Sequence, residues 1–185
     1  SENFDDLLIN KSAVIYGANG SGKSSLIEAI EFLEQYILFS FGNDSEDNDK
    51  AKDRKIPSFI FHDKNEGAIT PTTFDITFLN DDDEKVIYHL SLDNEKILEE
   101  GLWVYSRKGV RAKTLISRAY NEQDESFDYY NPGLDVDKRT LEIISGKLAV
   151  SPRIPMLTIL SAYQVKQAIS VSEWFRKNLD IVSTK

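Results

Sequence analysis

Apolar residues at the start of the chain follow two periods in succession, first that of a strand and then that of a helix. The apolar run at residues 12–16 (SAVIY) stops at Gly17, as expected for a strand that is buried on both faces and leads into a turn. From residue 24 to residue 41 the spacing is helical, and Gly42 stands where a glycine commonly ends a helix. The periodic positions are Leu26, Ile27, Ile30, Leu33, Ile37 and Leu38. The chain is therefore predicted to open as strand, loop and helix.

The middle of the chain alternates apolar and polar residues, which predicts antiparallel strands. One hairpin is expected around the turn at residues 80–84, because Phe74, Ile76 and Phe78 alternate before it and apolar residues alternate again after it. A second pair, residues 97–105 and 110–117, flanks a turn at 106–109. We therefore predict a β-meander of about four strands over residues 68–120. The turn-rich stretch at 121–137 marks a break after it.

The remaining segments are a polar linker and a helical arm. Residues 43–55 are mostly charged and have too few apolar side chains to offset the entropy of being ordered, so residues 43–67 are expected to be a flexible acidic loop and linker. From Lys138 onward apolar residues recur at helical spacing, which predicts helices over residues 135–185. Ser172, which precedes Glu173, is a predicted helix start. The fold class is α/β.

Composition limits the classes of function. The 185 residues carry 22 basic and 31 acidic side chains, a formal charge of -9, so no global positive field attracts nucleic acid or an anionic membrane surface. A local nucleic-acid contact is still conceivable at a basic hairpin tip formed by Arg107, Lys108, Arg111 and Lys113, although a solvated hairpin with protected edges explains the same charges. There is no cysteine and no apolar run of the roughly 20 residues that a membrane span needs. We expect a cytoplasmic protein that does not act on a membrane.

The glycine-rich segment after the first predicted strand carries the clearest chemistry. It matches the phosphate-binding pattern G-x-x-x-x-G-K-[ST] with the residues Gly17, Ala18, Asn19, Gly20, Ser21, Gly22, Lys23 and Ser24. Glycines let backbone N–H groups converge on an anion, and the positive end of the following helix supports them. Lys23 is expected to reach the β- and γ-phosphates, Ser24 to bind Mg²⁺, and Ser25 to bond the α-phosphate. A turn that binds nothing needs neither the lysine nor the serine, so the pattern predicts an ATP and Mg²⁺ site.

The hydrolytic residues are harder to place. A phosphate loop normally works with a second strand that ends in an acidic residue and helps hold the metal, and no apolar run ending in Asp-Glu follows Ser24. We therefore expect the chain to contain part of an ATPase domain, to bind nucleotide better than it hydrolyses it, and to leave the catalytic residues unassigned.

Residues 16–30 (YGANGSGKSSLIEAI) resemble the opening of ABC-type ATPase heads of the SMC, RecF and OLD kind. Further segments resemble the bacterial AAA-type ATPases associated with abortive phage infection; they are residues 71–78, 86–90, 97–102, 115–118 and 174–179. The resemblance implies a partial ABC-like ATPase domain over residues 1–185. Its P-loop NTPase core would begin with the strand and helix at 12–42 and would carry the antiparallel β-meander lobe and the C-terminal helical segment.

The same resemblance implies a function. ATPases of this kind work as ATP-sandwich homodimers and often accompany a nuclease or another toxic effector. The expectation is an ATPase of a bacterial anti-phage or DNA-maintenance system, inactive as this fragment alone. Two alternatives remain open: an ABC transporter ATPase subunit, and a scaffold that binds nucleotide without hydrolysing it.

The segment LSAYQ at residues 160–164 is similar to the LSGGQ signature of ABC proteins, but Tyr163 stands where the second glycine would approach the partner's γ-phosphate. Gln164 could instead be the glutamine that senses Mg²⁺ and the γ-phosphate in ABC heads. An ordinary polar residue on a helix is the alternative.

Overall fold

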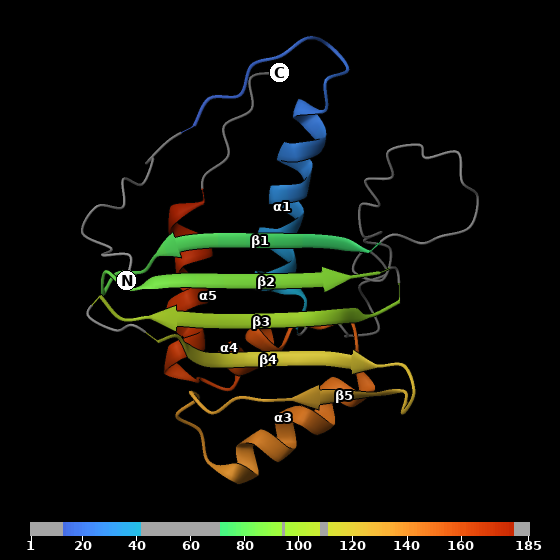
Figure 1. Ribbon diagram of the computed structural model, residues 1–185, viewed down its shortest axis with the longest axis vertical. Coiled ribbons are helices and arrows are strands. Elements are labelled where there is room, and N and C mark those ends of the chain that lie inside the picture. Colours follow the sequence, from blue (N-terminus) through green and yellow to red (C-terminus); the bar gives the residue numbers. More distant parts are fainter. Residues whose placement is uncertain (1–12, 42–70, 94, 108–110, 180–185) are drawn as a thin grey trace.

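The computed structural model describes residues 13–41, 71–93, 95–107 and 111–179. These residues form one antiparallel sheet with helices packed on one of its faces (Figure 1). The strands are β1 (Thr72–Leu79), β2 (Lys85–Leu92), β3 (Ile97–Tyr105), β4 (Lys113–Asn121) and β5 (Ser126–Tyr129). The helices are α1 (Lys23–Phe39), α3 (Lys138–Val150), α4 (Met156–Ala162) and α5 (Lys166–Asn178).

The sheet is a meander in which each strand pairs with the next along the chain, in the order β1-β2-β3-β4-β5. Because side chains alternate along a strand, every second residue points to the inner face, which the helices cover. On this face Tyr88 of β2 lies between Ile76 of β1 and Leu102 of β3. Both predicted hairpins are confirmed. The lobe extends beyond the predicted residue 120, however, because the four residues of β5 pair with β4 across a tight turn.

The core lies between the inner face of the sheet and helices α1, α4 and α5. Leu33 and Ile37 bring the C-terminal half of α1 into it, and Phe175 brings α5. The Phe175 ring meets the rings of Tyr88 and Phe78 edge-on, with centroids 6.0 and 5.8 Å apart. Helix α1 is therefore anchored in the core through its C-terminal half.

The strand predicted at residues 12–16 is not formed over residues 13–16, the part of it that the structure describes. Residues 13–16 have no regular secondary structure, and Val14, Ile15 and Tyr16 are 71%, 45% and 86% exposed. The physical reason is that a strand is held by its neighbours, and in the described part of the chain all five strands pair within the meander. The linker predicted at 43–67 and the glycine at position 42 lie outside the described residues.

The helical arm is confirmed over residues 138–178, but its predicted internal start is wrong. Ser172 lies inside α5, which begins after Val165. The Ser172 hydroxyl is 2.7 Å from the Ser161 hydroxyl of α4, so it joins two helices instead of capping one. None of the helices in the described ranges is both long enough and apolar enough to cross a membrane.

Candidate nucleotide-binding site

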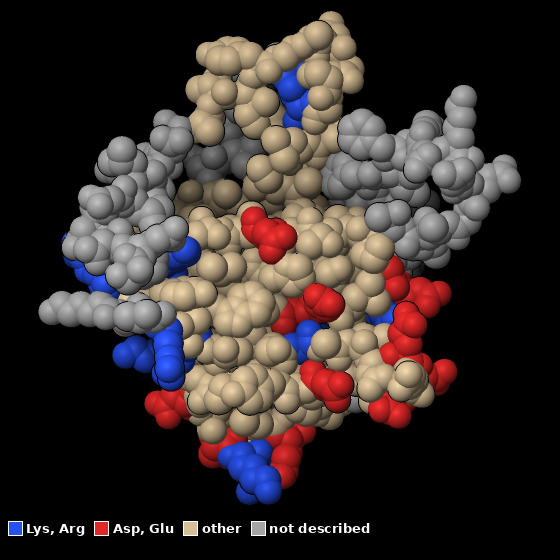
Figure 2. All heavy atoms as spheres, viewed as in Figure 1, with Lys and Arg blue, Asp and Glu red and all other residues tan. Residues whose placement is uncertain are grey.

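The glycine-rich loop sits at the free end of α1. Residues 13–18 run without regular structure into a turn at 19–22, which the Ser21 N–H closes by donating to the Ala18 carbonyl over 3.2 Å. Figure 1 places this loop at the end of α1 that points away from α4. Figure 2 shows the same end projecting from the body with few charged side chains, whereas charged side chains lie both on the face of the body below it and along its margins. The loop is thus presented to solvent by a helix anchored at its other end.

Three glycines give the loop its shape. Gly20 and Gly22 have φ of +80° and +88°, a region that other residues rarely adopt. A Cβ on Gly17 would stand 2.7 Å from the Ser21 hydroxyl, so a larger residue at position 17 would require Ser21 to change its rotamer. Gly22 precedes α1 and offers no side chain to its first amides. The start of α1 is therefore uncapped, and its N–H groups and dipole can act on an anion.

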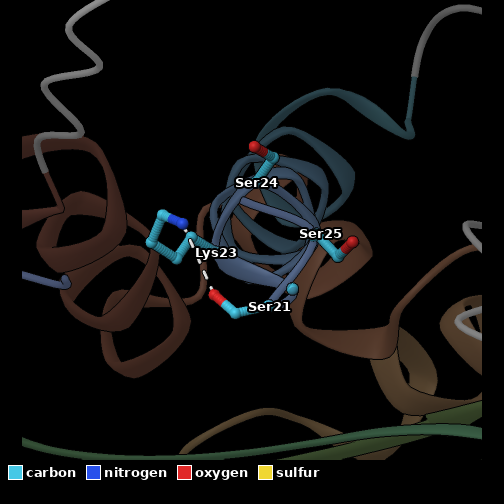
Figure 3. Close-up of a pocket in the computed structure, with 6 residues that line it drawn as sticks. Ser21, Lys23, Ser24 and Ser25 are labelled. Carbon is cyan, nitrogen blue, oxygen red and sulfur yellow. Dashed lines mark hydrogen bonds between the residues drawn. The ribbon is translucent and has the colours of Figure 1, made fainter. Parts of the chain in front are cut away.

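A cavity of about 200 Å³ lies at this helix start, lined by Gly20, Ser21, Gly22, Lys23, Ser24 and Ser25. Looking along α1, Figure 3 shows Lys23 on one side of the helix and the hydroxyls of Ser24 and Ser25 pointing outward on others. The residues predicted to hold the nucleotide are thus brought together, with Ala18 and Asn19 in the turn beside them. Their donor set of amides, one ammonium and two hydroxyls suits a phosphate group.

Lys23 is turned back onto the loop. Its Nζ donates to the carbonyls of Gly17 and Ala18 over 2.7 and 2.6 Å, and to the Ser21 hydroxyl over 3.4 Å. These acceptors satisfy the three donors of an ammonium group. Phosphate oxygens are charged and are stronger acceptors than carbonyls, so they can replace them when Lys23 turns outward. The residues present therefore fit a nucleotide phosphate.

The family model described as "AAA domain, putative AbiEii toxin, Type IV TA system" matches residues 12–152, which is more than half of the chain. The chain belongs to this family of AAA domains. No curated protein and no solved structure matches it. The family and the architecture together give an α/β fold of the P-loop NTPase class, and the AAA domain is of the type that resembles the ATPases of abortive infection systems.

Gln164 does not join the loop in this AAA domain. It is exposed in the turn between α4 and α5, with φ of +61°, and its N–H donates to the Ser161 carbonyl. Helix α4 meets α1 at the end opposite the loop, where the Thr158 hydroxyl donates to the Ile37 carbonyl. Within the described ranges no hydrogen bond or ion pair links Gln164 to residues 17–25, and its role at a metal stays a prediction. No group of three His, Asp or Glu side chains in those ranges could hold a metal ion.

The basic hairpin tip is partly neutralised by a neighbouring acidic turn. Arg107 forms an ion pair with Asp83 of the β1–β2 turn, with 3.2 Å between Nη1 and Oδ2. Arg111 is exposed, and Lys108 lies outside the described residues. A nucleic-acid contact at this tip stays a prediction.

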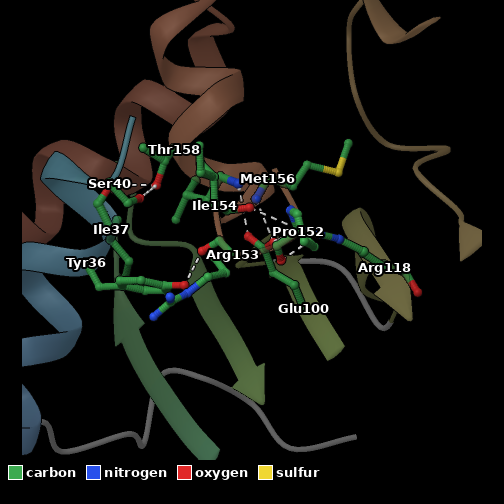
Figure 4. Close-up of polar contacts among 12 residues, drawn as sticks. Tyr36, Ile37, Ser40, Glu100, Arg118, Pro152, Arg153, Ile154, Met156 and Thr158 are labelled. Carbon is green, nitrogen blue, oxygen red and sulfur yellow. Dashed lines mark hydrogen bonds and ion pairs between the residues drawn. The ribbon is translucent and has the colours of Figure 1, made fainter. Parts of the chain in front are cut away.

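The AAA domain also contains a buried polar cluster that the sequence reading did not single out. Glu100 on β3 accepts the amide N–H groups of Met156 and Leu157 over 2.6 and 2.9 Å, and so caps α4 from the sheet. Arg118 on β4 donates to the carbonyls of Ile154 and Pro152 over 3.0 and 3.2 Å. Both side chains are fully buried, 3.8 Å apart. Tyr36, Glu100 and Arg118 hold the segment 152–157 in place. We refer to these three residues and the segment together as the polar joint (Figure 4).

Burial dominates the electrostatics of the polar joint. It raises the pKa of the Glu100 carboxyl, against the opposing effects of Arg118 and the two amides. It also raises the pKa of the Tyr88 hydroxyl, which donates to Glu100 over 3.2 Å, and the pKa of Tyr36. The strand alternation carries a signal for this cluster, because it places Glu100 and Arg118 on the inner face among apolar residues. A charge at such a position requires a buried partner.

Proposed function

We propose that this chain is the ATP-binding part of an ABC-like ATPase in a bacterial anti-phage or DNA-maintenance system, where ATP-dependent dimerisation controls a toxic effector. Two findings support the proposal. The matching family is described as an AAA domain with a toxin and a Type IV TA system in its name. The observation that carries the nucleotide assignment is the uncapped start of α1 behind two glycines of positive φ, with Lys23 beside it.

The loop residues would divide the work of holding ATP. Backbone amides at the start of α1 and the helix dipole stabilise negative charge on the phosphates. Lys23 exchanges its loop carbonyls for phosphate oxygens, and the motif assigns Mg²⁺ to Ser24 and the α-phosphate to Ser25. Bound Mg²⁺ supplies positive charge that neutralises the phosphates.

Hydrolysis requires more than these residues. Phosphoryl transfer needs a group that orients the attacking water and charges that stabilise the transition state, and loop amides with one lysine only position the phosphates. We propose that a second subunit completes the site when two heads close on ATP. In that arrangement nucleotide occupancy sets the dimer, and the dimer sets the activity of an associated nuclease or other toxic protein.

Calorimetric titration of the full chain with ATP and Mg²⁺ tests the nucleotide assignment. Lys23→Ala should bring ATP binding below detection, because an ammonium hydrogen bond to a charged group contributes about 1.5–3 kcal/mol and Lys23 is expected to make more than one. Lys147→Ala, which removes the same charge from the exposed last turn of α3, should leave the affinity unchanged. Equal affinities for ATP in the wild type and in Lys23→Ala would refute the assignment.

A further inference from the structure

The segment 152–157 is held through its backbone from two directions. Arg118 and Tyr36 donate to its carbonyls, Arg118 at Pro152 and Ile154 and Tyr36 at Arg153. Glu100 accepts its amides at Met156 and Leu157. Because donors meet the carbonyls and a carboxylate meets the amides, a shift of this segment by one residue would break several buried hydrogen bonds at once. Its position is therefore specified relative to both the sheet and α1.

Helix α1 supplies the second half of the contact. Its last turns reach α4 and the segment before it through the Tyr36 hydroxyl on the Arg153 carbonyl and through the Thr158 hydroxyl, which donates to the Ile37 carbonyl over 2.7 Å. Figure 4 shows Tyr36 and Ile37 on α1 facing Arg153 and Thr158. The Tyr36 ring also stacks on Phe32, with centroids 5.1 Å apart, and Phe32 stacks on Phe74 of β1.

The phosphate loop and the polar joint occupy opposite ends of this one helix. Its 17 residues span about 25 Å at 1.5 Å per residue, with Gly22 at the start and Tyr36 in the last turn. Its buried residues, Leu33 and Ile37, lie in the second half, whereas the first half is exposed or partly exposed. The structure has Lys23 on the Gly17 and Ala18 carbonyls, and the proposed binding of ATP would transfer it to phosphate oxygens.

We propose that the polar joint couples the conformation of the phosphate loop to that of the β-lobe and the helical arm. Nucleotide binding reorients α1, and Tyr36 passes this movement to the Arg153 carbonyl and thus to the amides that Glu100 holds. The expected change is in the hydrogen bonds of the Met156 and Leu157 amides at the start of α4. This inference rests on the proposed ATP binding and adds the route by which that binding reaches the rest of the domain.

Amide hydrogen exchange of the full chain, with and without ATP and Mg²⁺, tests the route. In the wild type the protection of the Met156 and Leu157 amides should change by about fivefold or more relative to amides of β2 and β3, which is the lower range of measured couplings between sites. Tyr36→Phe keeps the ring that stacks on Phe32 and removes the hydroxyl on Arg153, and should reduce this change to less than about twofold at unchanged ATP occupancy. Tyr120→Phe, on β4 next to the edge strand β5, should respond as the wild type does.

The outcomes separate this inference from the proposed function. If ATP binds and the two amides change no more than the reference strands, the route is refuted and the nucleotide site stands. A Tyr36→Phe response equal to that of the wild type refutes the route as well, since the hydroxyl is its link. If the wild type does not bind ATP, the proposed function fails, and the route fails with it.

Discussion

Two helix starts in this domain solve the same problem in opposite ways. The first amides of any helix lack partners within it. At α4 they are filled by Glu100, a carboxylate delivered from β3 into the core. At α1 a glycine precedes the helix, no side chain caps it, and a cavity opens there. A carboxylate of the protein itself thus caps α4, whereas the residues that line the cavity at α1 include no Asp or Glu.

Helix α3 gives a third case that sharpens the contrast. Asp137 accepts the Thr140 N–H over 3.0 Å and the Thr140 hydroxyl over 2.7 Å, all at the surface. This cap is local in sequence and exposed, whereas Glu100 is 56 residues from Met156 and buried. Helix α5 also lacks a side-chain cap, but the buried Val165 precedes it, not a glycine. The four helix starts, two capped and two without a side-chain cap, should therefore differ strongly in how much they contribute to stability.

The largest effect is expected from breaking the polar joint. Arg118→Met replaces the guanidinium with an apolar side chain and leaves Glu100 without its buried counter-charge. Such a loss typically lowers the free energy of unfolding by about 3–5 kcal/mol. Urea denaturation followed by the fluorescence of Trp103 and Trp174 measures it. Lys23→Ala, at the exposed loop, should change the same free energy by less than about 0.5 kcal/mol. Similar losses in the two variants would remove the proposed division between joint and loop.

A smaller effect is expected in alkali. Burial raises the pKa of Tyr36 and Tyr88 above the value of about 10 for an unfolded chain, so the folded state binds the phenolic proton more tightly. Stability is then complete below about pH 10 and falls as the pH rises further, by up to about 1.4 kcal/mol per pH unit for each phenol. Tyr88→Phe should flatten the fall seen in denaturation between about pH 10 and 12. Tyr16→Phe, at an exposed position, should leave it unchanged.

The smallest effect is expected at the surface cap. Hydrogen bonds from the Thr140 hydroxyl and N–H lower the pKa of Asp137, so its contribution is present above the ordinary aspartate pKa and is lost as the pH falls through the lowered value. Asp137→Ala should reduce stability at neutral pH by less than Arg118→Met does. The difference between wild type and Asp137→Ala should shrink on acidification, as measured by thermal unfolding at several pH values. A difference that grows in acid would contradict the sign of this pKa shift.

Local patterns predicted those parts of the fold that local forces decide. Helix α1 and the two hairpins follow from periodicity and turn residues within one segment, and they are confirmed. The strand predicted at 12–16 is not seen over residues 13–16, because a strand is stabilised by neighbouring strands that its own sequence does not specify. The short strand β5 was missed because its four residues lie inside a turn-rich stretch and gain their order only by pairing with β4.

The candidate site divides in the same way. The loop from Gly17 to Ser25 was predicted from the sequence because its proposed function depends on consecutive residues, and residues 20–25 of it line one cavity in the structure. The polar joint was not predicted because Glu100, Arg118 and the segment 152–157 come from three distant parts of the chain. The one signal in the sequence is that Glu100 on β3 and Arg118 on β4 are charged residues on an otherwise apolar face, and such residues require buried polar partners.

If the loop binds nucleotide as proposed, the folded-back position of Lys23 makes that binding an exchange of acceptors. The cation already has three acceptors, so an arriving ligand must outcompete the protein's own main chain before it gains the ammonium. In the proposed binding of ATP, the charged phosphate oxygens would replace these acceptors, because a charged oxygen is a stronger acceptor than a carbonyl.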